Sequence, residues 1–430
     1  MSFIVTRAEQ NPNFQIFTSG VETSRSEILP YDIEGYFDRG AKSPTRFIAP
    51  IDEWKTTAYN SFDATFIKPF TWLGRQIYLR VGSASAPYSI ELNGEIVAKI
   101  GDSASAHEID ITRKAQEGSN TIKIIFDVID RSRIIEGWRQ AEAKPHINDV
   151  YVVSQPTQMI RDIFTDSRVV GENLVTKLGI IVKSHALNQR TSNISVSLQS
   201  EAGEVLAQTT QAVTQRLRGE DTLYLNAITP LRDAWQADRP TMQILKLSTQ
   251  HEGRYQEHQT YNVALRSVEL NESGELFING QKVELKAKRI TTEYNPMELY
   301  KLKDMGYNSV VISAGVFNRE LISECDREGI YVLLTAPINT SNSGSGIEQG
   351  GNISNNPLLR SAFIDKIQTL YYTTQLHPSI IAYIIAENST NGCNLYDSYL
   401  EMKRLSTNRP VLYLDADGEW NSDIISIKID

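Results

Sequence analysis

The pattern of apolar residues changes once along this 430-residue chain, after Gly274, and that change limits what the chain can fold into. Before Gly274, short segments of alternating apolar and polar residues follow one another with few helical stretches, which is typical of β-sandwiches. After Gly274, strand-like and helix-like segments alternate at short intervals, which is typical of parallel βα units. We therefore expect a multidomain protein with β domains first and an α/β domain last.

The β part of the chain contains enough strand-like segments for two sandwiches. Its first half has them at QIYLRVG (76–82), YSIELNG (88–94), EIVAKIG (95–101), NTIKIIFDVID (120–130) and NDVYVVS (148–154). Asn93 and Gly94 stand between two of these segments and indicate a tight hairpin, because both residues tolerate a positive φ. We expect a jelly-roll β-sandwich over residues 1–157 and an immunoglobulin-like β-sandwich over residues 158–267.

The last part, residues 268–430, has too few residues for a closed barrel of eight βα units. Such a barrel takes about 250 residues, and at least about 200, whereas roughly 150 follow Val283. We count about six strands, ending with PVLYLD (410–415) and DIISIKID (423–430), and expect an incomplete TIM-type barrel. Six strands would leave two edges with unpaired backbone groups. We expect a second copy of the chain, in a homo-oligomer, or a partner protein to cover the open barrel edge.

Composition and charge exclude several kinds of partner. The net charge is −9 with an isoelectric point of about 5.4, and we find no stripe of lysines and arginines that would indicate nucleic-acid binding. Cys325 and Cys393 have no metal-type spacing and the six histidines are scattered, so we expect no cofactor and no metal. No apolar run approaches the ~20 residues of a membrane helix. The start, MSFIVTRAEQ, has too short an apolar core for a signal peptide.

The strand-like segment IIAYIIA leads directly into Glu387, Asn388 and Ser389. Catalytic residues of βα barrels lie at the carboxyl ends of the strands, so Glu387 is a candidate acid. The alternative is a strand-end carboxylate that bonds to neighbouring amides, with Asn388, Ser389 and Thr390 as a cap of the next helix. Asp415 is a further carboxylate after a strand, although its segment, DADGEW, is also typical of a turn.

Stretches in all three parts resemble glycoside hydrolase family 2, the β-galactosidase and β-glucuronidase family. They are RQIYLRVGSASAPYSIELNGEIVAKIGDSASAHEIDITRKAQEGSNTIKIIF (75–126), DVYVVSQPTQMIRDIF (149–164), LFINGQKVELKAKR (276–289), CDREGIYVLLTAP (325–337) and LHPSIIAYIIAENS (376–389). The resemblance implies a sugar-binding jelly roll, an immunoglobulin-like sandwich and a barrel in this order, with a carbohydrate as ligand. Trp138, in EGWRQ, falls where the family often places a segment that contacts the ligand, although a tryptophan more often packs in a core or between domains.

The chemistry that the resemblance implies is not matched at the strand ends. Members of the family are retaining glycosidases, with two glutamates about 5–5.5 Å apart that serve as acid/base and nucleophile. Against the family pattern IIAWSLGNES, the segment IIAYIIAENS puts Glu387 at the position of the asparagine and Asn388 at the position of the acid. An amide cannot donate the proton, and neighbouring strand residues point to opposite faces, so Glu387 does not simply replace the acid. The seventh strand, which carries the nucleophile in the family, is not found before Asp430.

Two functions remain open. The first is a catalytically inactive member of the family that acts as a carbohydrate- or protein-binding or assembly module. The second is a divergent β-glycosidase, similar to β-galactosidase, that hydrolyses O-glycosidic bonds with Glu387 or after completion by another chain. For both we take Glu387 and Asn388 as the catalytic positions, and Trp138, Asn388 and Asp415 as candidate ligand contacts. The family type implies a bacterial protein of the cytoplasm or periplasm.

Overall fold

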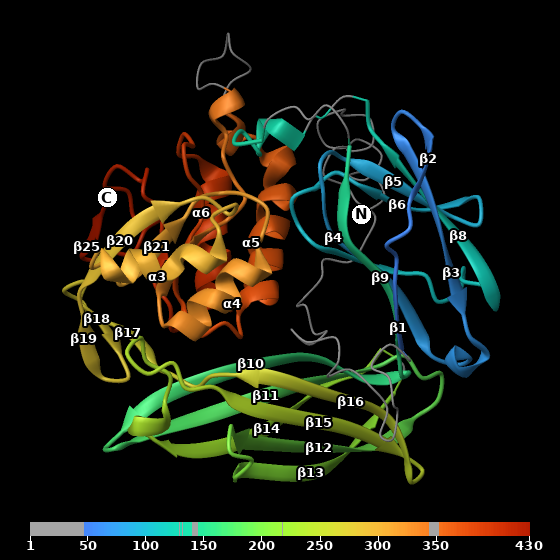
Figure 1. Cartoon of the computed structure of the whole chain (residues 1–430), viewed down its shortest axis with the longest axis horizontal. Helices are drawn as coiled ribbons and strands as arrows, with labels where there is room; N and C mark the ends of the chain where they lie inside the picture. Colours follow the sequence, from blue (N-terminus) through green and yellow to red (C-terminus); the bar gives the residue numbers. More distant parts are fainter. Residues whose placement is uncertain (1–46, 129, 131, 140–144, 217, 344–351) are drawn as a thin grey trace.

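Three bodies of secondary structure lie side by side in the computed structural model, which describes residues 47–430 apart from 129, 131, 140–144, 217 and 344–351. Figure 1 shows one β-sandwich on the right, a second below, and a curled sheet covered by helices on the left. The expected multidomain β plus α/β class is confirmed. The N-terminal stretch MSFIVTRAEQ lies outside the described residues, and the three domain boundaries stay a prediction. No helix of the described part is long and apolar enough to span a membrane.

The first sandwich packs a four-stranded sheet, β1-β9-β4-β7, against a five-stranded sheet, β2-β3-β8-β5-β6. Its strands are β1 (Ile48–Pro50), β2 (Lys55–Ala58), β3 (Ser61–Lys68), β4 (Gln76–Ala84), β5 (Tyr88–Leu92), β6 (Glu95–Ile100), β7 (His107–Asp110), β8 (Gly118–Phe126) and β9 (Ile147–Gln155). On β8, Ile122, Ile124 and Phe126 are buried while the residues between them are partly exposed, as the period of two requires. The predicted hairpin between β5 and β6 is confirmed, with φ of 53° at Asn93 and 85° at Gly94.

The second sandwich packs β10-β11-β14 against β13-β12-β15-β16, and its seven strands fit the expected immunoglobulin-like type. The strands are β10 (Gln158–Val170), β11 (Asn173–Ser184), β12 (Arg190–Ser200), β13 (Val205–Gln215), β14 (Glu220–Pro230), β15 (Gln243–His251) and β16 (Arg254–Val263). On β11, Leu178, Ile180 and Val182 are fully buried in the core. Gly179 lies between two of them, so close to the Phe164 ring that a Cβ would come within 2.1 Å of it, and this position therefore needs glycine.

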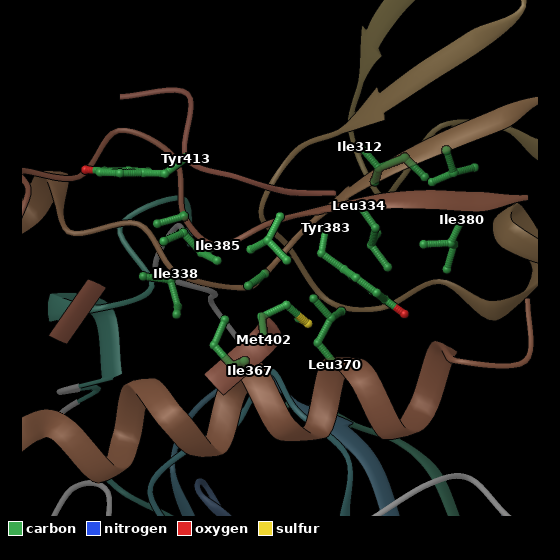
Figure 2. Close-up of a cluster of buried hydrophobic side chains, with 14 of the residues drawn as sticks. Ile312, Leu334, Ile338, Ile367, Leu370, Ile380, Tyr383, Ile385, Met402 and Tyr413 are labelled. Atoms are coloured by element: carbon green, nitrogen blue, oxygen red, sulfur yellow. The ribbon is translucent and has the colours of Figure 1, made fainter. Parts of the chain in front are cut away.

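The third part is a curled sheet of six parallel strands, the half-barrel, in the order β24-β23-β22-β21-β20-β25. These strands are β20 (Leu285–Ile290), β21 (Ser309–Ile312), β22 (Tyr331–Thr335), β23 (Ile380–Ile384), β24 (Val411–Leu412) and β25 (Ile427–Ile429), and they follow a small sheet of β17 (Val268–Leu270), β18 (Leu276–Ile278) and β19 (Gln281–Val283). The helices between them are α3 (Leu299–Asp304), α4 (Arg319–Glu328), α5 (Arg360–Thr374) and α6 (Cys393–Leu405). Figure 2 shows the outer face of the sheet, where Leu334 and Tyr383 pack with Ile367 and Leu370 of α5. Because both faces of β21, β22 and β23 are buried, their sequences are nearly continuous apolar runs.

The last strand lies beside a different neighbour from the one that its order in the sequence predicts. DIISIKID is expected next to PVLYLD, but β25 pairs with β20 at the other end of the sheet. In this position its alternation places Ile425, Ile427 and Ile429 on one side, against the apolar cluster at the concave face of the sheet. On its way to β20 the segment passes β24, where the N–H of Asp423 donates to the carbonyl of Val411 at 2.8 Å. We expected a partner to cover the open edge of the sheet, but at β24 the chain itself forms part of the hydrogen bonding along that edge.

A buried cluster of charges joins the first sandwich to the half-barrel. The ammonium of Lys366, on α5, lies 2.7 Å from Asp102 Oδ1 and 2.6 Å from Glu136 Oε1. Arg139 adds an ion pair to Glu136 Oε2 at 2.7 Å. Burial disfavours the charged amine, but the two carboxylates outweigh this and raise the pKa of Lys366. The sandwich and α5 are thus held together by groups that have little access to water.

The second sandwich is fixed to the amino end of the half-barrel. Trp235 is fully buried, and its Nε1–H donates to the carbonyl of Asp326 at 2.9 Å. The carboxylate of Asp326 in turn contacts His377 Nδ1 at 2.5 Å and accepts the N–H of Ser379 at 3.0 Å. His377 and Ser379 immediately precede β23, so these bonds fix the start of that strand relative to the second sandwich.

Replacing Lys366 by methionine is expected to lower the free energy of unfolding by about 3–5 kcal/mol, because it leaves two buried carboxylates without their cation. Urea unfolding followed by circular dichroism measures this loss. Lys114→Met is the matched control, because Lys114 pairs with Glu95 where both side chains are more than half exposed, and little change is expected there. Equal losses in the two variants would contradict the structural role of the buried cluster.

Candidate ligand site at the carboxyl end of the half-barrel

Glu387 lies at the carboxyl end of the half-barrel and connects several strand ends there. Its N–H donates to the carbonyl of Ile338, after β22, at 3.1 Å. Its carboxylate accepts hydrogen bonds from the Ser313 hydroxyl and the Ala314 N–H, which follow β21. Arg289, on β20, places Nη1 3.5 Å from Glu387 Oε2. The side chain of Glu387 is 14% exposed, so an edge of the carboxylate still faces the opening.

The surroundings of Glu387 favour its protonated form. Partial burial raises the pKa of this carboxyl, and the nearby charge of Asp415 raises it further. The hydrogen bond from Ala314, the charge of Arg289 and the hydrogen bond from Ser313 act in the opposite direction, but the net pKa stays above the ordinary value. Glu387 therefore keeps a proton to a higher pH than a solvated glutamate does.

Asn388 points elsewhere than Glu387. It has a φ of 47°, in the left-handed region, and its side chain is exposed. The next residue, Ser389, accepts the N–H of Thr340 at 3.0 Å on its hydroxyl, and its own N–H donates to Asp415 Oδ2 at 3.4 Å. The structure thus brings Asp415 into contact with the loop of Asn388. The alternative prediction of a helix cap is wrong, because α6 begins at Cys393 and Gly392 is its N-cap. The predicted turn at Asp415 is present, with positive φ at Asp417 and Gly418.

Trp138 reaches this end of the half-barrel on a loop of the first sandwich that follows a short 3-10 helix (Ser132–Ile134). The N–H of Gly137 donates to Asn339 O at 2.8 Å, and the N–H of Asn339 donates to Ile135 O at 2.6 Å. A Cβ on Gly137 would lie 2.9 Å from the Asn339 carbonyl oxygen, so the two loops touch backbone to backbone. Trp138 stacks loosely on the Arg139 guanidinium, 5.2 Å from its ring centre, and its buried Nε1–H has no hydrogen-bond partner among the described residues.

The four predicted site residues therefore come from loops at one end of the half-barrel. The loop after β22 connects them, because Ile338 bonds to Glu387, Thr340 to Ser389 and Asn339 to the loop of Trp138. Sequence reasoning missed Arg289 and Ser313, which hold the Glu387 carboxylate. Both could have been proposed from the sequence, because each stands at or just after the end of a predicted strand, as Glu387 does.

Proteins of one family resemble this chain. Residues 281–430 match the family model described as glycosyl hydrolases family 2, TIM barrel domain. The β-galactosidase of Priestia megaterium is 23% identical, over 83% of this chain and 37% of that protein. The β-galactosidase of Pectobacterium atrosepticum is 25% identical, over 82% of this chain and 35% of that protein.

These comparisons support a member of glycoside hydrolase family 2. Solved structures share its fold: a putative β-galactosidase of Bacteroides fragilis has a TM-score of 0.69 at 12% identity, over 86% of this chain and 58% of that one. The β-glucuronidase 2 of Bacteroides uniformis, covalently bound to cyclophellitol-6-carboxylate aziridine, has a TM-score of 0.67 at 15% identity, over 83% of this chain and 46% of that one. The chain spans about a third of the length of the curated relatives.

The raised pKa of Glu387 has a consequence for stability. Because the folded state holds this proton more tightly than the unfolded state, the contribution of the carboxyl is largest below the ordinary value of 4.5 and falls as the pH rises towards the folded pKa. Wild type is therefore expected to lose stability relative to Glu387→Gln as the pH rises above 4.5. Urea unfolding at several pH values measures the difference. The ¹³C carboxyl spectrum, assigned by its change in Glu387→Gln, gives the pKa directly, and a value at or below 4.5 would contradict the prediction.

Proposed function

We propose that this chain binds a carbohydrate at the carboxyl end of its half-barrel and does not cleave it by the double displacement of retaining glycosidases. The observation that supports this most directly is the side chain at position 388. Asn388 stands where the family pattern has the acid/base glutamate, and an amide has no proton to give to a leaving oxygen. Its left-handed backbone also differs from that of a strand residue.

Glu387 has a binding and structural role in this proposal. Its carboxylate is held by Ser313, Ala314 and Arg289, so it fixes the ends of three strands relative to one another. Lone pairs that remain at its exposed edge can accept a hydrogen bond from a sugar hydroxyl. A carboxylate held in this way is a rigid acceptor for a polar ligand.

The groups around Glu387 suit a neutral polyhydroxylated ligand. Asn388 and Asp415 are exposed and offer amide and carboxylate groups to hydroxyls. Trp138, which is partly exposed, offers an aromatic surface. The curated relatives named β-galactosidase support a sugar as the class of ligand.

A divergent β-glycosidase is the second candidate, and one observation favours it. Glu387 has a raised pKa beside a second carboxylate, Asp415, which is the arrangement that separates a general acid from an ionised partner. In this candidate Glu387 donates the proton and Asp415, or a residue of another chain, supplies the second carboxylate.

Turnover and binding separate the two candidates. Wild type and Glu387→Gln are expected to release nitrophenolate from a panel of nitrophenyl β- and α-glycosides at the same background rate, because the acid position holds an amide.

Saturation-transfer NMR with free galactose and glucose is expected to detect binding, weakened about threefold or more in Trp138→Leu through the lost aromatic surface. Tyr59→Leu, an exposed residue of the first sandwich, is the control. Turnover by wild type that disappears in Glu387→Gln would establish the second candidate instead.

We also propose that a second copy of the chain covers the surface beside β24. Leu414, Trp420 and Ile424 are large, apolar and exposed there, which is typical of an interaction surface. Light scattering on a sizing column is expected to give a dimer for wild type and a monomer for Trp420→Asp. Ile67→Asp, which changes an exposed residue of the first sandwich, should leave the dimer intact. A monomeric wild type would contradict the assembly part of the proposal.

A further inference from the structure

A groove lies between the second sandwich and the helices of the half-barrel, at the end of the sheet opposite to Glu387. It has a volume of ≈ 270 Å³. One wall is the middle of β10, from Phe164 to Ser167, and the other is the loop 405–409 that follows α6. Arg266 and Arg409 both line it. The groove is separate from the candidate sugar site, because Arg266 bonds to the residues that begin β23 and Glu387 follows the end of that strand.

The two guanidinium groups are held in fixed positions. Arg266 donates to the carbonyls of Pro378 and Ile380. Arg409 donates from Nη1 to the Tyr383 hydroxyl and from Nη2 to the carbonyl of Gln375, each at 2.6 Å. A guanidinium has five N–H groups, so each arginine keeps donors that these bonds do not use.

Neither guanidinium of this pair is in direct contact with a carboxylate. Neither arginine forms an ion pair with any described residue of the chain. Asp166, which also lines the groove, accepts the Asn408 amide at 2.6 Å, and Asp162 accepts the Gln375 amide at 2.9 Å. Burial, together with the like charge of Arg409, lowers the pKa of Arg266 to about 9, so Arg266 stays charged at neutral pH.

We propose that this groove binds a small ligand through an oxyanion, a phosphate or a carboxylate, placed between Arg266 and Arg409. Arginines in fixed positions bind such groups well, because the planar guanidinium offers paired donors that match two oxygens. Ser406 and Thr407 add hydroxyl groups on the rim of the groove. An anion here would also relieve the repulsion between two like charges that are partly removed from water.

A purely structural role predicts different behaviour. If the arginines only fasten the second sandwich to the barrel, an added anion has no preferred position and acts through ionic strength alone. If the groove is a binding site, anion binding is saturable and depends on the charge at the rim. Thr407 tests this, because it is exposed and belongs to the rim, and neither arginine donates a bond to it.

The experiment is a titration of the full chain with inorganic phosphate by isothermal calorimetry, at constant ionic strength set with sodium chloride. Saturable binding is expected in wild type, weakened at least tenfold in Thr407→Glu, which puts a negative charge beside the anion, and changed less than twofold in the matched neutral variant Thr407→Gln. Arg409→Lys, which keeps the charge but loses the fork, is expected to weaken binding as well.

The same titration with acetate distinguishes the two kinds of oxyanion. Binding of phosphate alone assigns the groove to phosphorylated ligands, and binding of acetate at similar strength extends it to carboxylates. Both results support the site. Absence of saturable binding for both anions, or equal affinity in Thr407→Glu and Thr407→Gln, would overturn the proposal. This outcome does not depend on the sugar-binding function, because the titration uses no sugar and no residue of the Glu387 site.

Discussion

The ammonium of Lys366 lies between the carboxylates of Asp102 and Glu136, and the position of the first sandwich against the half-barrel depends on this contact. Charges taken out of water cost several kcal/mol each unless they are paired at close range. Small displacements of the sandwich are therefore unfavourable. Glu136 also belongs to the loop that pairs with Asn339, so the same contact holds Trp138 at the opening of the half-barrel. The wall of the candidate site and the joint between the two domains are built from one set of interactions.

Glu387 and Asn388 differ from the family pattern by an exchange of neighbours, and the backbone explains why the exchange is not a small change. Glu387 lies three residues beyond the end of β23, with its N–H bonded to Ile338 and its carboxylate turned towards Ser313 and Arg289. At Asn388 the chain takes a left-handed conformation, which costs most residues about 1–2 kcal/mol and asparagine less. A glutamate at position 388 of this loop would therefore be strained. The residue present fits the local turn better than it fits proton transfer.

Local patterns of sequence predict the strands of this protein well, and contacts between distant segments much less. The alternation on β8 and the hairpin at Asn93 follow from the side-chain period and from the φ that asparagine tolerates. The partner of β25 does not follow from such a pattern, because the apolar cluster at the concave face includes residues of β24 as well as of β20, and the alternating isoleucines fit either. The contact of Lys366 with Asp102 and Glu136 was not predictable either. Lys366 stands more than 200 positions from both carboxylates in the sequence, and the two carboxylates lie in separate loops. In the site, Glu387 was predicted from its strand end, but Arg289 and Ser313 became visible only when the strands were placed side by side.

The two ends of the half-barrel present different charged groups, and this bears on which ligands each can hold. At the carboxyl end, Arg289 faces Glu387 and Asp415 adds a second carboxylate, an arrangement that favours a neutral ligand over an anionic one. At the amino end, Arg266 and Arg409 stand without a carboxylate partner, so a neutral ligand would leave their repulsion unrelieved. The second sandwich lies against the amino end and the first against the carboxyl end, so each domain forms a wall of a different site. If both proposed sites bind their ligands, one scaffold would separate a neutral ligand from an anionic one by charge.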